Sequence, residues 1–330
     1  MSPVPVVVVV PSIAVDALVE RCVAECHRVA PGVEVVVLVD DAGAADRLGG
    51  TATVVETGPV SIAAKRNRAV AEAGTEFVAF IDSDAYPADG WLDHAVELLR
   101  ADPMLAVVGG PNVSPPDEPP SERYVGRAHR SFLVDGWWTF RKVPGAAARD
   151  VDNLPSCNMV VRRSTYLDLG GMDESLFTGE DVDLCARLTS AGYRMHFTPD
   201  VMVFHKNRST WSFVVQRFTF GVAMVPLWRR GERLTSGYSA VSLALAVFTL
   251  FLASGPLGCW FRRWGWWWNR VVAAYVALVL AEAVRHAATP AEVPGVAWAL
   301  AVGNLAPGAG VVAKALGLVP DLRGVYRNDR

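Results

Sequence analysis

The stretch Glu76-Phe-Val-Ala-Phe-Ile-Asp82-Ser-Asp84 decides the fold, because five consecutive apolar residues run directly into two carboxylates. An apolar run of this length without polar alternation is typical of a strand that is buried on both faces. Side chains alternate along an extended segment, so Asp82 and Asp84 are expected to point the same way and Ser83 the opposite way. Two hard oxygen donors on one face favour Mg²⁺ or Mn²⁺, and the alternative is a solvated turn that closes the strand.

The residues around this stretch repeat a pattern of apolar strand and amphipathic helix. Strands are predicted over residues 4–10, 33–39, 53–55, 77–81 and 105–108, and helices over 15–29, 61–73 and 90–100. This alternation indicates an α/β fold, with a Rossmann-like, mostly parallel sheet and helices on both faces. Ligands of open α/β sheets bind at the carboxyl ends of the strands, which is where Asp82 and Asp84 fall.

The pattern loosens after residue 111. Residues 112–122 are rich in proline and polar side chains and predict a long loop, and residues 123–142 are assigned to no element. The sequence Gly179-Glu180-Asp181-Val182-Asp183 is typical of a helix start, because acids in the first turn complement the helix dipole. Further strands are predicted over 157–161, 194–197 and 201–204, and helices over 165–169 and 209–230.

The composition indicates that part of the chain meets lipid. Apolar residues make up 52% of the 330 residues, and the mean hydropathy of +0.25 is high for a soluble enzyme. Of 31 basic and 34 acidic residues, eight basic and four acidic ones lie from Thr235 onward, which leaves a net charge of −7 on the first 234 residues. No basic tract suggests nucleic acid as a partner.

Three apolar segments follow Arg233. Residues 238–258 and 293–313 hold no charge and are long enough to cross a bilayer, which takes about 20 residues. Residues 271–281 are only eleven, and the tryptophans beside them are typical of a membrane interface. Two or three membrane spans are predicted, with an interfacial middle helix or a buried hairpin of a soluble protein as alternatives. A truncated protein that ends near Arg233 is expected to be soluble and to keep its ligand binding.

Several features place the first part of the chain in the cytoplasm. The N-terminus has neither the positive region nor the long apolar run of a signal peptide. Five cysteines without regular spacing fit a reducing compartment, and Cys22 and Cys26 are interpreted as residues lining a helix rather than a metal pair. By the positive-inside rule the same side is indicated by Arg229, Arg230 and Arg233.

Six short motifs follow one another between residues 4 and 220, which is about two thirds of the chain. They are the apolar strand into Pro11, Val39-Asp40-Asp41, Lys65-Arg66-Asn67, Asp82-Ser83-Asp84, Gly170-Gly171-Met172-Asp173-Glu174 and Gly179-Glu180-Asp181-Val182-Asp183-Leu184. Each motif is weak alone, but their order and spacing together are specific. In them the chain resembles the family 2 glycosyltransferases with a GT-A fold, of the membrane-anchored bacterial type.

The resemblance implies a nucleotide-sugar site at the strand ends. Asp40 or Asp41 would accept a hydrogen bond from the donor base, a uracil imide, and Pro11 and Asn67 are assigned to the same pocket. Arg66 would pair with diphosphate oxygens, where the fixed guanidinium fork has an advantage. The alternative for Arg66 is a solvated helix face.

The resemblance also implies a metal site and a general base. Asp84, with Asp82 close by, would hold Mg²⁺ or Mn²⁺ on the diphosphate. His205 could reach the same metal, although a lone histidine before a helix is more often a surface or packing residue. Asp181 of the Glu180-Asp181 dipeptide would take the proton of the acceptor hydroxyl as it attacks the anomeric carbon from the face opposite the leaving group. The alternative for both acids is stabilisation of a helix start alone.

The resulting hypothesis is a metal-dependent, inverting glycosyltransferase of the hexosyltransferase type at the cytoplasmic face of the cell membrane. It would move one sugar from a nucleotide-diphosphate sugar, UDP-linked by hypothesis, to a hydroxyl acceptor such as a lipid-linked one. A single transfer is favoured because processive members of the family carry Gln-x-x-Arg-Trp, where this chain has Gln216-Arg217-Phe218.

The predicted domains are 1–234, a glycosyltransferase domain, and 235–330, a set of membrane-associated helices. The first divides into a nucleotide-sugar half, 1–111, and an acceptor and base half, 112–234. Two other classes of protein remain as alternatives. One is a non-catalytic, membrane-anchored subunit that binds a nucleotide sugar. The other is a haloacid dehalogenase-like phosphatase, which the Tyr86-Pro87 pair after the second aspartate disfavours.

Overall fold

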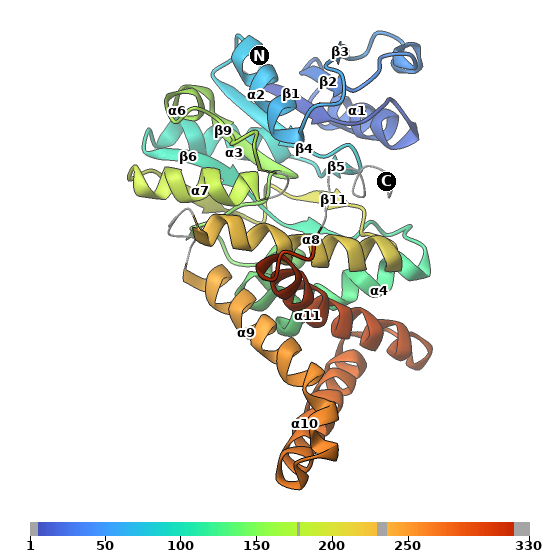
Figure 1. The fold of residues 1–330 in the computed structure, drawn as a ribbon. Coiled ribbons are helices and arrows are strands. Elements are labelled where there is room, and N and C mark those ends of the chain that lie inside the picture. The colour runs from blue at the N-terminus through green and yellow to red at the C-terminus, as the bar shows by residue number, and fades with distance from the viewer. Residues whose placement is uncertain (1–5, 177–178, 230–235, 320–330) are drawn as a thin grey trace. The chain divides into compact units, whose positions relative to one another are not determined.

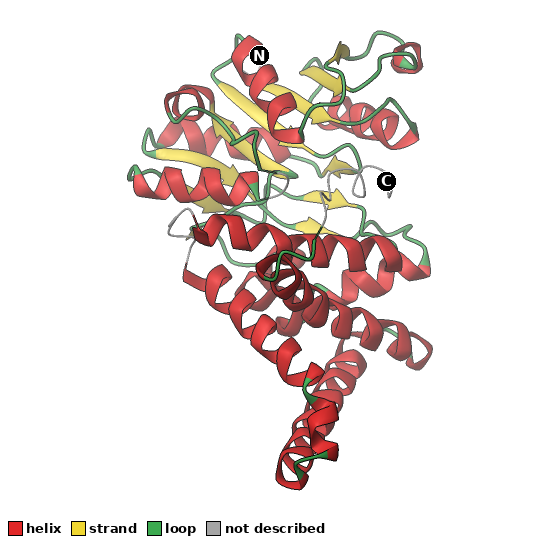
Figure 2. Cartoon of the chain, in the orientation of Figure 1, coloured by secondary structure: helices red, strands yellow, loops and turns green. Residues whose placement is uncertain are grey.

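The computed structural model describes residues 6–176, 179–229 and 236–319. The chain packs into two compact units, each built from two stretches of sequence. Unit 1 comprises Met1–Pro115 and Phe140–Lys206, and unit 2 comprises Pro116–Thr139 and Asn207–Arg330. All described strands belong to unit 1, and the described regular elements of unit 2 are helices. Figure 2 colours the strands yellow and the helices red.

An eight-stranded sheet forms the centre of unit 1 (Figure 1). Its strand order is β3-β2-β1-β4-β9-β6-β10-β8. Six strands run the same way, whereas β9 is antiparallel to β4 and β6, and β8 is antiparallel to β10. The predicted fold class, a mostly parallel α/β sheet, is confirmed. The strands are β1 (Val6–Pro11), β2 (Glu34–Val39), β3 (Thr53–Glu56), β4 (Phe77–Ile81), β6 (Leu105–Gly109), β8 (Arg149–Val151), β9 (Asn158–Arg162) and β10 (Arg194–Phe197).

The alternation of side chains along β1 explains why helices cover both faces of this sheet. Val8 and Val10 pack in one core cluster with residues of α1 and α3, and Val7 and Val9 pack in another with α2, α6 and α7. All four side chains are buried, so the strand is apolar on both faces, as its sequence predicts. The helices are α1 (Ala17–Val29), α2 (Ile62–Glu72), α3 (Trp91–Ala101), α6 (Arg163–Asp168) and α7 (Glu180–Ser190), with a short 3-10 helix η1 (Ala45–Leu48).

The two acids that follow β4 lie in a turn. The strand ends at Ile81, and the backbone N–H of Ala85 donates to the carbonyl of Asp82 at 3.0 Å. The expected strand-like alternation of Asp82 and Asp84 is therefore wrong, because the chain leaves the main sheet at this point. It enters a second sheet of order β5-β11-β7, whose strands are β5 (Ala85–Pro87), β7 (Asn112–Val113) and β11 (Val203–His205).

Unit 2 joins the segment between the two halves of unit 1 to the C-terminal helices. Its core combines Val125 and Val134 of the inserted segment with Phe213 and with apolar residues of the last two helices, such as Ala283 and Leu300. Part of the predicted long loop and of the unassigned segment is thus helical. The helices are α4 (Pro120–Ala128), α5 (Phe132–Asp135), α8 (Thr210–Arg229), α9 (Ser236–Ala253), α10 (Arg262–His286) and α11 (Val293–Ala315), with 3-10 helices η3 (Gly255–Cys259) and η4 (Pro290–Glu292); η2 (Gly136–Lys142) leads back into unit 1.

Two helices in the described part of the chain are long and apolar enough to cross a membrane by length and composition. They are Arg262–His286 and Pro290–Ala315, whose most apolar 18-residue stretches have mean hydropathies of 1.3 and 1.6. The expectation that the middle segment is too short is wrong, because residues 271–281 are the centre of the 25-residue helix α10. The described side chains of α9 form a shorter apolar stretch, Val241–Ala253. Arg230 and Arg233, used to orient the chain, lie outside the described residues, as does the predicted boundary at 234 and 235.

A truncated protein that ends at Arg233 should aggregate rather than stay soluble, contrary to the expectation from sequence. Val125, Val134 and Phe213 share their buried core with Ala299 and Leu300 of α11, and the truncation exposes them to water. Size-exclusion chromatography of the truncated and full-length proteins in the same detergent and in plain buffer makes the comparison. A monodisperse truncated protein in plain buffer would show that residues 116–139 do not depend on α11.

Candidate active site

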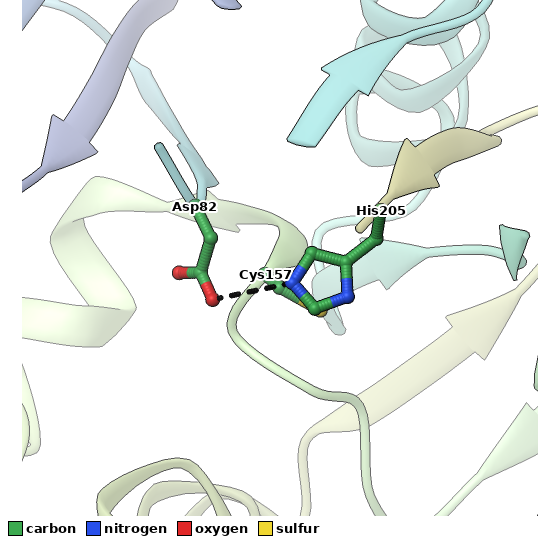
Figure 3. Close-up of side chains that lie close together, drawn as sticks. All are labelled: Asp82, Cys157 and His205. Carbon is green, nitrogen blue, oxygen red and sulfur yellow. Dashed lines mark ion pairs between the residues drawn. The ribbon is translucent and has the colours of Figure 1, made fainter. Parts of the chain in front are cut away.

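Asp82, Asp84 and His205 come together at the end of β4. The antiparallel pairing of β5 and β11 sets His205 opposite Ala85, next to the turn that carries both acids. The His205 Nε2 atom lies 3.3 Å from Asp84 Oδ1 and 3.8 Å from Asp82 Oδ2. Figure 3 shows the imidazole and the Asp82 carboxylate pointing toward each other. The structure thus places the three predicted metal ligands in one cluster.

This cluster has the donor chemistry of a cation site. His205 Nε2 is buried and has no hydrogen-bond partner, although two carboxylates face it. A third kind of ligand, the thiol of Cys157, lies beside them, and the ligand atoms of Asp82, Cys157 and His205 are all within 4.8 Å of one another. Burial and the Asp82 carboxylate raise the pKa of Cys157 well above its usual range. Cys157 was not predicted, because no metal-type spacing links it to the other ligands.

A buried arginine connects this cluster to the start of α7. Arg66 is 1% exposed; its Nη2 donates to Asp82 Oδ1 at 2.8 Å and its Nη1 to Glu180 Oε1 at 2.9 Å. Burial acts to lower the pKa of Arg66, but Asp82 and Glu180 outweigh it and the pKa is raised. The solvated helix face considered for Arg66 is therefore wrong. Two carboxylates take up its guanidinium fork, and its contact with a diphosphate stays a prediction.

The Glu180-Asp181 pair begins α7 after Gly179, whose φ of 87° lies in the left-handed region that favours glycine. The backbone N–H of Ser156 donates to Asp181 Oδ2 at 3.2 Å, and that of Val182 donates to Asp181 Oδ1 at 2.8 Å. Asp183 points elsewhere: Arg187 binds its Oδ2 through two donors, at 2.6 and 2.9 Å. Asp181 is therefore next in sequence to Glu180, which Arg66 binds. Asp183 instead pairs with Arg187 one turn further along α7.

Glu180 is the acid with the most perturbed titration at this site. Burial and the neighbouring Asp181 raise the pKa of Glu180 from 4.5 to about 7, although Arg66 acts in the opposite direction. The folded protein therefore holds the Glu180 proton more tightly than the unfolded chain does. The stability that this proton contributes is complete below pH 4.5 and is lost as the pH rises through 7.

Replacing Glu180 by Gln should make unfolding less dependent on pH. As the pH rises from about 5 to 8, the free energy of unfolding of the variant should increase by up to about 3 kcal/mol relative to that of wild type. The reason is that the variant has no buried carboxyl to ionise at this position. Urea unfolding of both proteins across this range, in the presence of a chelator, measures the difference. Glu72→Gln is the matched control, since Glu72 is exposed and pairs with Arg68 on α2 at 3.0 Å. A constant difference between wild type and Glu180→Gln would mean that Glu180 titrates normally.

The residues predicted to hold the donor base lie at the ends of β1 and β2. Lys65 Nζ pairs with Asp40 Oδ1 at 2.6 Å and also donates to the carbonyl of Ser12, so this carboxylate is tied to a buried ammonium. Asp41 is exposed, and its Oδ1 accepts from the backbone N–H of Gly43 at 2.8 Å. Pro11 is the buried last residue of β1. Of the two aspartates, Asp41 is thus the more accessible to a ligand.

Asn67 is engaged in a different part of unit 1. Its Nδ2 donates to the carbonyl of Met172 at 2.8 Å, and its Oδ1 accepts from the backbone N–H of Met172 at 2.9 Å and from the Tyr166 hydroxyl at 2.6 Å. These bonds hold the Gly170-Gly171-Met172 turn against α2. The structure accounts for Asn67 as a loop anchor, and its contact with a donor stays a prediction.

The sequence of this chain matches a known protein family and is similar to known glycosyltransferases. The family described as "Glycosyltransferase like family 2" matches residues 3–221. The chain is similar to the pre-mycofactocin glycosyltransferase of Mycobacterium tuberculosis, with 35% identity over 198 residues, 59% of this chain and 41% of that protein. It is also similar to glycosyltransferase AglE of Haloferax volcanii, with 26% identity over 194 residues, 58% of this chain and 59% of that protein. The alignments thus span between two fifths and three fifths of these relatives.

Among solved structures, the fold is similar to that of mannosyltransferase PcManGT from Pyrobaculum calidifontis, solved in complex with GDP-Man and Mn²⁺. The TM-score is 0.61 at 19% sequence identity, and the match covers 96% of this chain and 90% of that chain. At this level of identity the likeness concerns the fold. Together with the family match over residues 3–221, the mostly parallel sheet and the acids at its strand ends lead to one conclusion: the chain belongs to the glycosyltransferase family 2 and has a GT-A-like fold.

Proposed function

We propose that the chain is an inverting glycosyltransferase that moves one sugar from a UDP-linked donor to a hydroxyl acceptor. The observation that carries the proposal is the Arg66 bridge. Arg66 binds both Asp82, which lies in the cluster with Asp84 and His205, and Glu180, which precedes Asp181. The bridge supports the proposal because it would hold a ligand of a diphosphate-bound cation and the neighbour of a carboxylate base at fixed positions within one unit. The names of the similar proteins support a glycosyl transfer. Because the Pyrobaculum calidifontis structure holds GDP-Man, a GDP-linked sugar is the first alternative donor to test.

In this proposal the residues divide the work between leaving group and nucleophile. Asp82, Asp84 and His205 would hold the divalent cation, which supplies positive charge to the departing diphosphate. Asp181 accepts the acceptor proton as the hydroxyl oxygen attacks the anomeric carbon. Arg66 keeps the Asp82 and Glu180 carboxylates at fixed positions, so neither moves when the charge of the donor arrives. Attack from the face opposite the leaving group inverts the anomeric configuration.

A donor panel tests the function. The full-length protein in detergent is mixed with UDP- and GDP-linked hexoses, with Mn²⁺, Mg²⁺ or chelator, and release of nucleoside diphosphate is followed with and without lipid-linked and soluble hydroxyl acceptors. UDP release that needs a divalent cation, together with an inverted anomeric centre in the product by NMR, supports the proposal. Binding of a donor without turnover under every condition would favour the non-catalytic subunit. Release of inorganic phosphate from simple phosphomonoesters would favour a phosphatase.

We propose further that the helices of unit 2 hold the protein at the cell membrane, with the catalytic residues on the cytoplasmic side. Of the two candidate spans, α10 is the stronger. Only 11% of its most apolar 18-residue stretch is buried inside the protein, against 50% for α11, so α10 leaves more apolar surface for lipid. Trp260, just before α10, and Trp267, in its second turn, are 83% and 58% exposed, which suits a membrane interface. Carbonate extraction of membranes should leave the protein in the pellet and detergent should release it. Full recovery in the soluble fraction without detergent would contradict the anchor.

A further inference from the structure

The antiparallel strand β9 brings Cys157 to the cluster that contains Asp82 and His205. Ile81, the last residue of β4, pairs with Asn158, the first residue of β9, in antiparallel register. The next residue outward on each strand is therefore Asp82 on one side and Cys157 on the other. This register, together with the placement of His205 by β11, gathers a carboxylate, a thiol and an imidazole within 4.8 Å (Figure 3).

The surroundings of Cys157 differ from those of the buried cysteine Cys185. The Cys185 thiol donates to the carbonyl of Leu154 at 3.7 Å, as a cysteine of the core does. The Cys157 sulfur instead accepts a hydrogen bond from the side-chain amide of buried Asn112, with Nδ2 at 3.2 Å. An amide that donates to sulfur is the kind of outer contact that supports a sulfur acting as a metal ligand. His205 Nε2, a buried atom that makes no hydrogen bond, lies in the same cluster and faces two carboxylates.

We propose that Cys157 is a ligand of the catalytic-site cation and makes this site prefer Mn²⁺, Co²⁺ or Zn²⁺ to Mg²⁺. The inference rests on the proposed function only in taking the Asp82 and His205 cluster as the cation site. When the cation binds, the S–H bond breaks, a sulfur–metal bond forms and the thiol proton passes to solvent. Thiolate is a soft ligand that Mg²⁺, which favours carboxylate and water oxygens, accepts poorly.

Cobalt spectroscopy tests the ligand directly, without any measurement of turnover. Full-length protein in detergent, freed of metal with chelator, is titrated with Co²⁺ while its near-ultraviolet spectrum is recorded. Wild type should develop a thiolate-to-cobalt charge-transfer band. Cys157→Ser and Cys157→Ala should lose it, while Cys185→Ser and Cys259→Ser should keep it, because Cys185 is buried in the core and Cys259 is exposed in η3. Circular dichroism and melting curves confirm that each variant is folded.

Metal competition then measures the selectivity. Calorimetric titration of wild type and Cys157→Ser with Mn²⁺ and Mg²⁺ should show that the ratio of the two affinities falls by about tenfold or more in the variant. A cobalt band that survives in Cys157→Ser, or an unchanged Mn²⁺ to Mg²⁺ ratio, would overturn the inference. If Asp82→Asn still abolishes Co²⁺ binding in that case, the cation site and the proposed function stand and only the thiolate is excluded. If wild-type protein binds no divalent cation and still transfers sugar, the metal part of the proposed function fails as well.

Discussion

The Asp181→Asn variant is expected to keep its fold and its donor affinity and to lose sugar transfer by about 10²- to 10⁴-fold, the range for removal of a general base. An asparagine retains a carbonyl oxygen, so one of the backbone bonds that Asp181 accepts, from Ser156 or Val182, can persist. It cannot take a proton from the acceptor hydroxyl. Steady-state transfer with a saturating donor, together with calorimetric donor binding, separates lost chemistry from lost binding.

Asp183→Asn is the matched control on the same helix. Asp183 is buried and accepts two bonds from Arg187, so its replacement weakens an ion pair that fixes α7. It should lower the melting temperature and leave the transfer rate of the folded protein within a few-fold of wild type. Near-normal transfer by Asp181→Asn would exclude it as the base. A folded but inactive Asp183→Asn protein would show that the helix is right and the acid is wrong.

Local patterns in the sequence predicted the parts of the site that lie at the ends of apolar strands. The run from Phe77 to Ile81 identified β4, and the acids directly after it, Asp82 and Asp84, do lie in one cluster. The reason given for their proximity was incorrect, since they lie in a turn and not along a strand. His205 and Cys157 depend on strand pairing instead. Whether β9 runs parallel or antiparallel to β4 cannot be read from Asn158–Arg162, because a short apolar strand looks the same in both directions.

Packing between distant parts of the chain explains why helix α4 of unit 2 was not predicted from the sequence. The helix α4 is nine residues long, and its apolar residues Val125 and Ala128 gain their buried surroundings from α11, far along the chain. A short apolar stripe of this kind gives little signal by itself. The length of α10 was missed for a different reason. Its first turns are rich in tryptophan and arginine, so the apolar centre was counted without the flanking residues that continue the same helix.

The Asp84→Asn variant should bind the donor more weakly in the presence of Mn²⁺ and turn over on the order of a hundredfold or more slowly, because the cation supplies several kcal/mol to the leaving group. Asp84 Oδ1 is the carboxylate oxygen nearest to His205 Nε2, at 3.3 Å, and an amide in its place offers neither the charge nor the same affinity for a cation. Calorimetric titration of UDP-sugar with and without Mn²⁺ is the measurement.

The same substitution at Asp89 provides the control, because that acid is 85% exposed and pairs with Arg28 at 2.6 Å on the surface of unit 1. Asp89→Asn should leave the Mn²⁺-dependent affinity and the turnover unchanged. Donor affinity that does not depend on a divalent cation in wild type, and that Asp84→Asn leaves as it was, would remove the metal from the proposed reaction. Charge on the leaving diphosphate would then have to be met by side chains alone, and the buried guanidinium of Arg66 would need to leave one of its two carboxylates to do so.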